Sequence, residues 1–333
     1  MNFDPSYLLP KTKRLVETSI QIIVLKAKVL IQQSFGFGKE LTWRDVLRFL
    51  VVVAMAGFLL SFGSSQLTPA DQKVSLLHPI LLADASLPPK ITARSAYLLD
   101  LQSGFVLYDK NSLRKLPPAS TVKVATALVA LDNYKLDEVV VVPSTCVLRT
   151  GESIMGLQPR EKITVRDLLR GLLIASASDA ACTLAYHHPE GVLTFVAAMN
   201  HLAAALKLEQ TYFVNPTGLD SSLQYSSAQD LTVLTKKALK DPFLCEVVKT
   251  KEITVSSNDG KFQHYLKTTN ELLGKIPGIL GVKTGYTGKA KEVFVFYFKG
   301  GEREFLGAVM GSSDRFSDTK DLLAWILSSF RFP

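Results

Sequence analysis

A serine and a lysine three positions apart, Ser120 and Lys123, open an apolar stretch near the middle of the chain. Two prolines precede them, and the run 124–131 holds only alanine, valine, leucine and one threonine, so a helix starting near Ser120 is predicted. Residues i and i+3 of a helix are neighbours, and Ser120 would lie at the positive end of the helix dipole. A serine hydroxyl is a good nucleophile only when a base takes its proton. The spacing therefore predicts a serine nucleophile activated by a lysine.

The pattern S-x-x-K alone is weak, because the chain contains it three times, also at Ser112 and at Ser317. Only the copy at Ser120 opens an apolar helix, since the other two lie in polar surroundings. The competing interpretation of Ser120 is a serine that caps a helix.

Two further motifs favour the chemical interpretation. Lys283-Thr284-Gly285 occurs once, within a β-prone run punctuated by glycines that could form an edge strand lining a groove. Ser176 and Ser178 follow the apolar run 168–175, and buried hydroxyls need hydrogen-bond partners.

In this order, the motifs Ser120-x-x-Lys123, Ser176-x-Ser178 and Lys283-Thr284-Gly285 resemble those of the serine-type D-alanyl-D-alanine carboxypeptidases, the low-molecular-mass penicillin-binding proteins of peptidase family S11. The resemblance covers nearly all of 90–333 and includes flanking runs at 93–110, 155–157, 161–169, 213–220 and 269–273. It implies an α/β (α+β) fold of the β-lactamase and penicillin-binding-protein transpeptidase type, in which a five-stranded antiparallel sheet is flanked by helices beside an all-helical lobe.

The resemblance also implies roles. Ser120 would attack the penultimate D-alanine carbonyl of a peptidoglycan stem peptide, Lys123 would take the serine proton, and Ser176 would relay a proton to the leaving amine with help from Lys283. Backbone N–H groups of Ser120 and Tyr286 would hold the oxyanion. The implied catalytic set is Ser120, Lys123, Ser176, Ser178 and Lys283, and the implied substrate-binding set is Thr284, Gly285, Tyr286 and Arg315. β-Lactam antibiotics would be covalent inhibitors, and neither a metal nor an organic cofactor is required.

Two departures from the family pattern bear on rate and specificity. Ser178 replaces an asparagine, so a carboxamide is exchanged for one hydroxyl. The run 290–293 reads Ala-Lys-Glu-Val where relatives usually carry Ala-Gly before a strand. Two alternatives therefore stay open: a β-lactamase-like hydrolase, and a catalytically weak wall-binding homologue. Arg315 has its own alternative, a surface arginine in front of a helix.

Lys123 can act as a base only when it is uncharged, and an ordinary lysine with a pKa of about 10.4 is almost fully charged at neutral pH. Burial against the helix 124–131 and a second cation at Lys283 both disfavour the charged form. We therefore predict that Lys123 is substantially uncharged.

Other chemistries find little support. There is no G-x-S-x-G motif, and the five histidines lack an ordered Ser-His-Asp context. His187-His188 before a proline is typical of a helix end rather than a metal site. The three cysteines lack C-x-x-C spacing. One disulfide is compatible with export, but Cys182, in an apolar helical run, is expected to be a packed thiol.

The composition and charge indicate which classes of partner the protein binds. The chain has 333 residues, 47% of them hydrophobic, and a formal net charge of +8. Its basic residues are dispersed and no cluster interleaves with aromatics, which argues against nucleic acid. A membrane surface or an anionic wall polymer suits the charge better.

The chain is expected to divide into a basic cytoplasmic segment (1–48), a transmembrane anchor or signal segment (49–67), a proline-containing linker (68–90) and the catalytic domain (91–333). Residues 1–48 carry eight basic and four acidic residues, and 49–62 are apolar except for Ser61. Basic residues before an apolar segment predict a cytoplasmic N-terminus and an extracytoplasmic remainder. We favour an uncleaved single-pass anchor in the cell membrane, with a cleaved signal and a secreted enzyme as the alternative.

Within the catalytic domain, hairpins are predicted at 94–110 and 292–311, and helices at 165–187, 193–206, 228–240 and 318–330. The chain stops after that last helix, so the C-terminal β-domain and membrane-binding tail of many relatives are expected to be absent and the tether to be N-terminal.

Overall fold

The computed structural model describes residues 78–147 and 151–333. The chain divides into two units, 1–74 and 75–333, and every described residue belongs to the second. The segments expected at 1–48 and 49–67 lie outside the described residues. Among the described residues, no helix is both long and apolar enough to cross a membrane.

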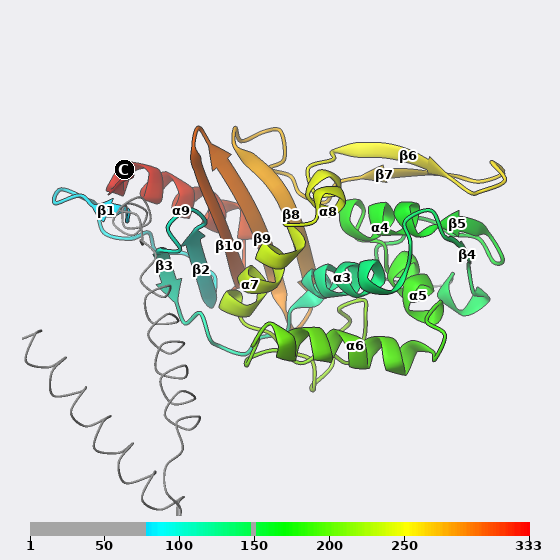
Figure 1. Ribbon diagram of the computed structural model, residues 1–333. Helices are drawn as coiled ribbons and strands as arrows, with labels where there is room; N and C mark the ends of the chain where they lie inside the picture. The colour runs from blue at the N-terminus through cyan, green and yellow to red at the C-terminus, as the bar shows by residue number, and fades with distance from the viewer. Residues whose placement is uncertain (1–77, 148–150) are drawn as a thin grey trace, which may run out of the picture. The chain divides into compact units, whose positions relative to one another are not determined.

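One antiparallel sheet of five strands forms the centre of the described unit, in the order β3-β2-β10-β9-β8 (Figure 1). Both predicted hairpins are confirmed, because β2 pairs with β3 and β9 pairs with β10. The motif 283–285 lies in β8, which is an edge strand as expected, since only β9 pairs with it. The bounds are β2 Ser95–Asp100, β3 Val106–Lys110, β8 Ile279–Thr287, β9 Lys291–Gly300 and β10 Arg303–Ser312.

Both faces of this sheet are buried. Successive strand residues point to opposite faces, so Phe294 and Phe296 of β9 pack in one cluster with helix α9 (Arg315–Ser329), while Val293 and Val295 pack in the other. Helix α7 (Ala228–Ala238) covers the second face, where it contacts β10 and β2. The alternation explains why β9 carries an almost unbroken apolar run.

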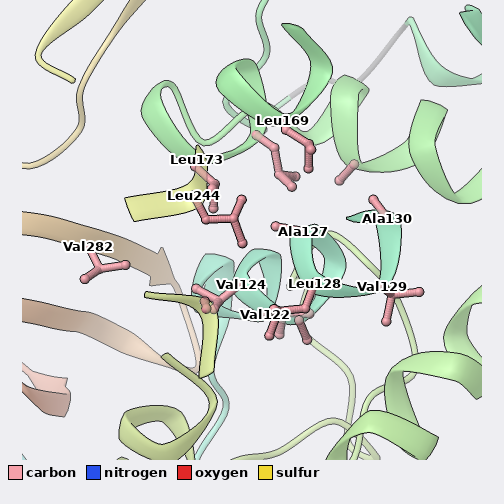
Figure 2. Close-up of a cluster of buried hydrophobic side chains, with 14 of the residues drawn as sticks. Val122, Val124, Ala127, Leu128, Val129, Ala130, Leu169, Leu173, Leu244 and Val282 are labelled. Carbon is pink, nitrogen blue, oxygen red and sulfur yellow. The ribbon is translucent and has the colours of Figure 1, made fainter. Parts of the chain in front are cut away.

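A lobe made mainly of helices lies beside the sheet, with α3 at its centre (Figure 1). Val124, Ala127 and Leu128 of α3 and Leu169 and Leu173 of α4 belong to the larger core cluster (Figure 2). The lobe consists of α3 Lys123–Asn133, α4 Val165–Ile174, α5 Ser178–Tyr186, α6 Val192–Ala205 and α8 Pro242–Val247, with the hairpins β4 Val139–Val141 with β5 Lys162–Thr164 and β6 Glu252–Ser256 with β7 Gln263–Lys267. The expected fold class is therefore confirmed.

Two helix boundaries differ from expectation. The helix predicted over 165–187 is broken at 175–177, where Ser176 has a φ of +59°, a left-handed conformation that ends α4. The last helix begins at Arg315 rather than at 318, because Asp314 caps it by accepting a hydrogen bond from the Ser317 N–H.

The described part of the expected linker, residues 78–90, is hydrogen-bonded to the catalytic domain. Strand β1 (Ile80–Leu81) pairs with β11 (Phe330–Arg331), and the Trp325 indole N–H donates to the Ser86 carbonyl across 2.9 Å. The segment 78–90 therefore runs against the C-terminal helix.

Candidate active site

Ser120 and Lys123 lie together at the entrance to helix α3. Ser120 belongs to a short 3₁₀ turn, η3 (Ala119–Val122), and Lys123 is the first residue of the α-helix. The Lys123 Nζ donates to the Ser120 Oγ across 3.0 Å. Lys123 is only 1% exposed, whereas Ser120 is half-buried and lines a cleft of about 670 Å³. The amine is thus buried behind a hydroxyl that faces open space.

Two glycines let neighbouring segments approach this turn. Ala119 has a φ of +50°. A Cβ on Gly218 would lie 2.0 Å from the Ala119 carbonyl oxygen, and a Cβ on Gly285 would lie 2.9 Å from the Ser120 nitrogen. Any larger residue would push the nucleophile segment away, because no real Cβ contact is that short.

Lys123 has two further oxygen partners. Its Nζ donates to the Thr217 carbonyl across 2.8 Å and to the Ser178 Oγ across 3.2 Å. A charged ammonium has three protons to donate and no lone pair. An uncharged amine has two protons and one lone pair. If Lys123 is uncharged, one of these three oxygen atoms must therefore donate a proton to the Lys123 nitrogen. The Thr217 carbonyl cannot donate, which leaves the hydroxyls of Ser120 and Ser178.

The two serines of the second motif occupy different places. Ser178, the first residue of α5, is 2% exposed and contacts Lys123. Ser176, between α4 and α5, is 4% exposed, and both serines line the cleft. The hydroxyl that replaces the family's asparagine therefore still reaches the lysine.

Lys283 belongs to strand β8, and it is not among the residues that line the cleft. It is 1% exposed, and its Nζ donates to the Thr284 carbonyl across 2.8 Å. Burial lowers the pKa of Lys283 well below its usual range, and the neighbouring cations Lys123 and Arg315 act in the same direction. Three basic side chains, Lys123, Lys283 and Arg315, thus share one region.

Arg315 enters the cleft from the start of α9. Its Nη1 donates to the Gly285 carbonyl across 2.9 Å, and its backbone N–H donates to the Glu292 carboxylate across 2.8 Å. Burial lowers the pKa of Arg315, while Glu292 and two further carboxylates oppose the shift. The interpretation of Arg315 as an isolated surface arginine does not fit this position.

Residues 290–293, which depart from the family's usual Ala-Gly, have a defined local structure. Lys291 adopts a φ of +58°, the conformation for which glycine is the usual residue. Glu292, which follows it, accepts the hydrogen bond from Arg315. The residue that follows the strained position therefore fixes the start of α9.

Several cleft residues carry no chemical signal in the sequence. Thr269 lines the cleft, and its hydroxyl lies 2.5 Å from that of Thr284. The Thr217 carbonyl is invisible to motif analysis, because any residue supplies one. The cleft is lined by the expected Ser120, Ser176, Ser178, Thr284, Gly285, Tyr286 and Arg315, and also by Gly151, Glu152, Ser153, Thr217, Gly218, Leu219, Asp220, Thr269, Thr287 and Gly288.

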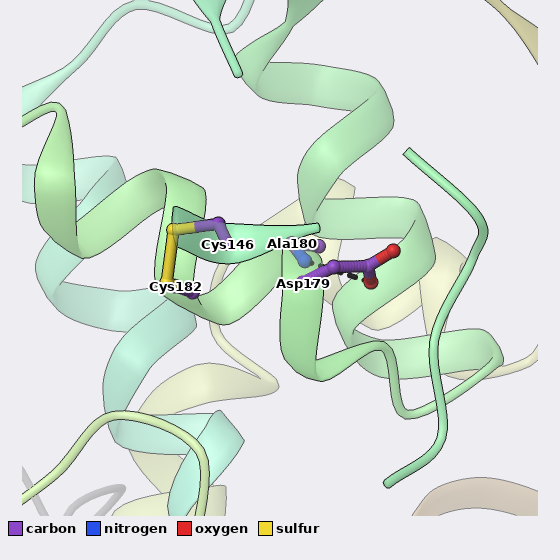
Figure 3. Close-up of a disulfide and its surroundings, with 4 residues drawn as sticks. All are labelled: Cys146, Asp179, Ala180 and Cys182. Carbon is purple, nitrogen blue, oxygen red and sulfur yellow. Dashed lines mark hydrogen bonds between the residues drawn. A yellow bond between two sulfur atoms is a disulfide. The ribbon is translucent and has the colours of Figure 1, made fainter. Parts of the chain in front are cut away.

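The expectation for Cys182 is wrong. Cys182 forms a disulfide with Cys146, at the end of the short 3₁₀ turn η4 (Ser144–Cys146) (Figure 3). Helical periodicity placed Cys182 correctly in a buried helix, but its partner lies 36 residues earlier, in an irregular segment.

A family model described as D-alanyl-D-alanine carboxypeptidase, peptidase family S11, matches residues 83–314. The chain belongs to this family. Over 227 residues it is 38% identical to the D-alanyl-D-alanine carboxypeptidase DacF of Bacillus subtilis, and the match covers 66% of this chain and 58% of that protein. Over 224 residues it is 36% identical to DacB2 of Mycobacterium tuberculosis, covering 67% of this chain and 76% of the relative.

Solved structures of this carboxypeptidase family share the fold. The crystal structure of the Streptomyces K15 DD-transpeptidase superposes with a TM-score of 0.69 at 32% sequence identity, covering 73% of this chain and all of that one. A D-alanyl-D-alanine carboxypeptidase from Mycobacterium tuberculosis gives a TM-score of 0.68 at 33% identity, covering 75% of this chain and 96% of that one.

Proposed function

We propose that this protein is a serine-type D-Ala-D-Ala carboxypeptidase that removes the terminal D-alanine from peptidoglycan stem peptides. The observation that carries the proposal is the 3.0 Å contact between the Lys123 Nζ and the Ser120 Oγ, at the wall of a cleft bounded by the edge strand β8. Membership of the carboxypeptidase family supports it.

In the proposed acylation step, uncharged Lys123 takes the proton of Ser120 while the serine oxygen attacks the carbonyl carbon of the penultimate D-alanine. The resulting oxyanion is held by the backbone N–H groups of Ser120 and Tyr286. Each donor of this kind typically contributes about 3–4 kcal/mol of transition-state stabilisation. The proton then passes to the leaving D-alanine amine.

The two serines of the second motif have different roles in this proton transfer. Ser178 contacts the Lys123 amine directly and orients it. Ser176, which faces the cleft, is the hydroxyl that relays the proton toward the leaving group. Water then hydrolyses the acyl-serine, with the same lysine acting as base.

The substrate carboxylate is proposed to bind in the part of the cleft that Arg315, Thr284 and Thr269 line. Arg315 supplies a guanidinium, and Thr284 and Thr269 supply two hydroxyls in mutual contact. A charged donor set of this kind suits a free C-terminal carboxylate. β-Lactams, which also carry a carboxylate, are proposed to acylate Ser120 as covalent inhibitors.

We also propose an extracytoplasmic catalytic domain that residues 49–67 anchor to the cell membrane. The Cys146–Cys182 disulfide supports this location, because disulfides persist in oxidising compartments outside the cytosol.

The test uses the full chain purified in detergent. A pentapeptide ending in D-Ala-D-Ala and a fluorescent penicillin are added to the wild type and to Ser120→Ala. Release of D-alanine and stable labelling, both abolished in Ser120→Ala, are expected. Ser317→Ala is the matched control, because Ser317 opens another S-x-x-K sequence, on α9. Rapid drug turnover would favour a β-lactamase, and neither activity would favour a wall-binding protein.

A further inference from the structure

One wall of the cleft makes several contacts to helix α5. Cys146 is joined to Cys182 of α5 by the disulfide. The backbone N–H of Ser178 donates to the Ser153 carbonyl across 2.8 Å. The Asp179 carboxylate accepts hydrogen bonds from the backbone N–H groups of residues 155, 156 and 157 at 3.0–3.2 Å. Figure 3 shows Asp179 and the disulfide on the same short helix.

Residues 151–153, between these anchors, line the cleft. Gly151 and Ser153 are exposed, and the apolar Ile154 that follows is 44% exposed. The side chains of this wall segment, residues 151–154, therefore bury little apolar surface of their own. The Ser153 carbonyl is bonded to α5, and further contacts to α5 lie on either side of the segment, the disulfide earlier in the chain and Asp179 after it.

The nucleophile is positioned by other elements. Ser120 and Lys123 are held by η3 and α3, and strand β8 abuts them at Gly285. Ser178 also lies on α5, but the apolar side of that helix packs in the main core through Ala181 and Leu184. Loosening the wall segment should therefore leave the nucleophile in place.

We propose that the Cys146–Cys182 disulfide is a positioning element for substrate binding, which fixes the wall segment against the stem peptide without taking part in the chemistry. This inference rests on the proposed carboxypeptidase function. Under this proposal the disulfide contributes to the affinity for the peptide. KM then depends on the disulfide, whereas kcat and the rate of acylation by a small β-lactam do not.

Both cysteines are buried, Cys146 at 0% and Cys182 at 2% exposed. Reduction by a dithiol therefore requires the structure around the disulfide to open locally first. The dithiol supplies two electrons and two protons, the S–S bond breaks into two thiols, and the reductant leaves as its own disulfide.

The experiment compares the full chain in detergent before and after dithiothreitol treatment with the variant Cys146→Ser/Cys182→Ser. Cys245→Ser is the control, because Cys245 is a free cysteine outside the cleft and its removal should leave the dithiol response unchanged. Hydrogen exchange is followed at the backbone amides of 155–157, together with KM and kcat for D-alanine release and the rate of penicillin labelling.

Without the disulfide, we expect exchange at 155–157 to accelerate about tenfold. We also expect KM to rise roughly tenfold as preorganisation is lost, with kcat and penicillin labelling unchanged. A folded, reduced protein with unchanged exchange and unchanged KM would overturn the inference, as would a fall in kcat at constant KM. If the oxidised protein releases no D-alanine, the proposed function fails, and the exchange measurement alone still decides whether the disulfide holds the wall.

Discussion

The hydroxyl of Ser178 accepts a hydrogen bond from Lys123 across 3.2 Å, although 55 residues separate them in the sequence. Ser178 therefore occupies a position from which it can orient the amine or exchange a proton with it. The shorter side chain does not by itself make the protein a non-catalytic relative.

Replacing Ser178 by alanine should slow acylation. The variant removes one of the three oxygen partners of Lys123, and positioned proton-transfer groups typically contribute about 10²–10⁴-fold. Because Ser178 only orients the base, a loss near the lower end, about 10²-fold in kcat, is expected with little change in KM. Stopped-flow labelling with penicillin measures the effect, and an unchanged acylation rate would show that the contact has no catalytic value.

Substituting alanine for Gly218 should disable the nucleophile. The new Cβ would lie 2.0 Å from the Ala119 carbonyl oxygen, and a displacement of Ser120 by about 1 Å can cost roughly 10²-fold in rate. Gly260→Ala is the matched control, because Gly260 also has a positive φ but nothing within 4 Å of the new atom. Both variants should lose about 1 kcal/mol of stability from the positive φ, and Gly218→Ala should lose more because of the clash, but only Gly218→Ala should lose labelling. Equal labelling in both would contradict the packing argument.

Lys283 should make stability rise with pH. Its pKa is lowered in the folded protein from 10.5, so at pH values between the lowered value and 10.5 the unfolded chain binds a proton that the folded chain does not. The free energy of unfolding then increases with pH by up to about 1.4 kcal/mol per unit, and the increase ends near the pKa of the unfolded chain. Urea unfolding of the wild type and of Lys283→Met between pH 7 and 9.5 measures this. The same slope in both proteins would refute the assignment.

Arg315 should determine affinity for the free carboxylate. In Arg315→Gln, KM for a peptide ending in D-Ala-D-Ala should rise about 10–100-fold, the range for losing a hydrogen bond to a charged group. A peptide with an amidated C-terminus should be affected little, because it offers no carboxylate. Arg331→Gln, on an exposed arginine of β11, is the control. Equal losses for the two peptides would mean that Arg315 only supports the fold.

The sequence predicted those parts of the site that depend on local pattern. The apolar run after Lys123 indicated a buried helix, and the glycine-punctuated run around Lys283 indicated an edge strand. Both signals arise within about ten residues, where helical and strand periodicity are informative.

The remaining features depend on contacts between distant segments. The Thr217 carbonyl meets Lys123 across 94 positions, and the Asp179 carboxylate collects amide protons from residues 22–24 positions earlier. Neither contact leaves a mark in periodicity or composition. The break at Ser176 was missed because its left-handed backbone is imposed by tertiary structure, not by the residue type.

The pairing of β1 with β11 has a consequence for engineering. Ile80 lies opposite Arg331, so the first and last described segments of the domain are adjacent. Closely spaced ends allow circular permutation. A short linker could join 333 to 78, and new ends could open at the exposed turn at 258–261, between β6 and β7. Such a permutant would move any membrane tether to a different surface of the catalytic domain and would show whether the direction in which the cleft faces the wall limits the reaction.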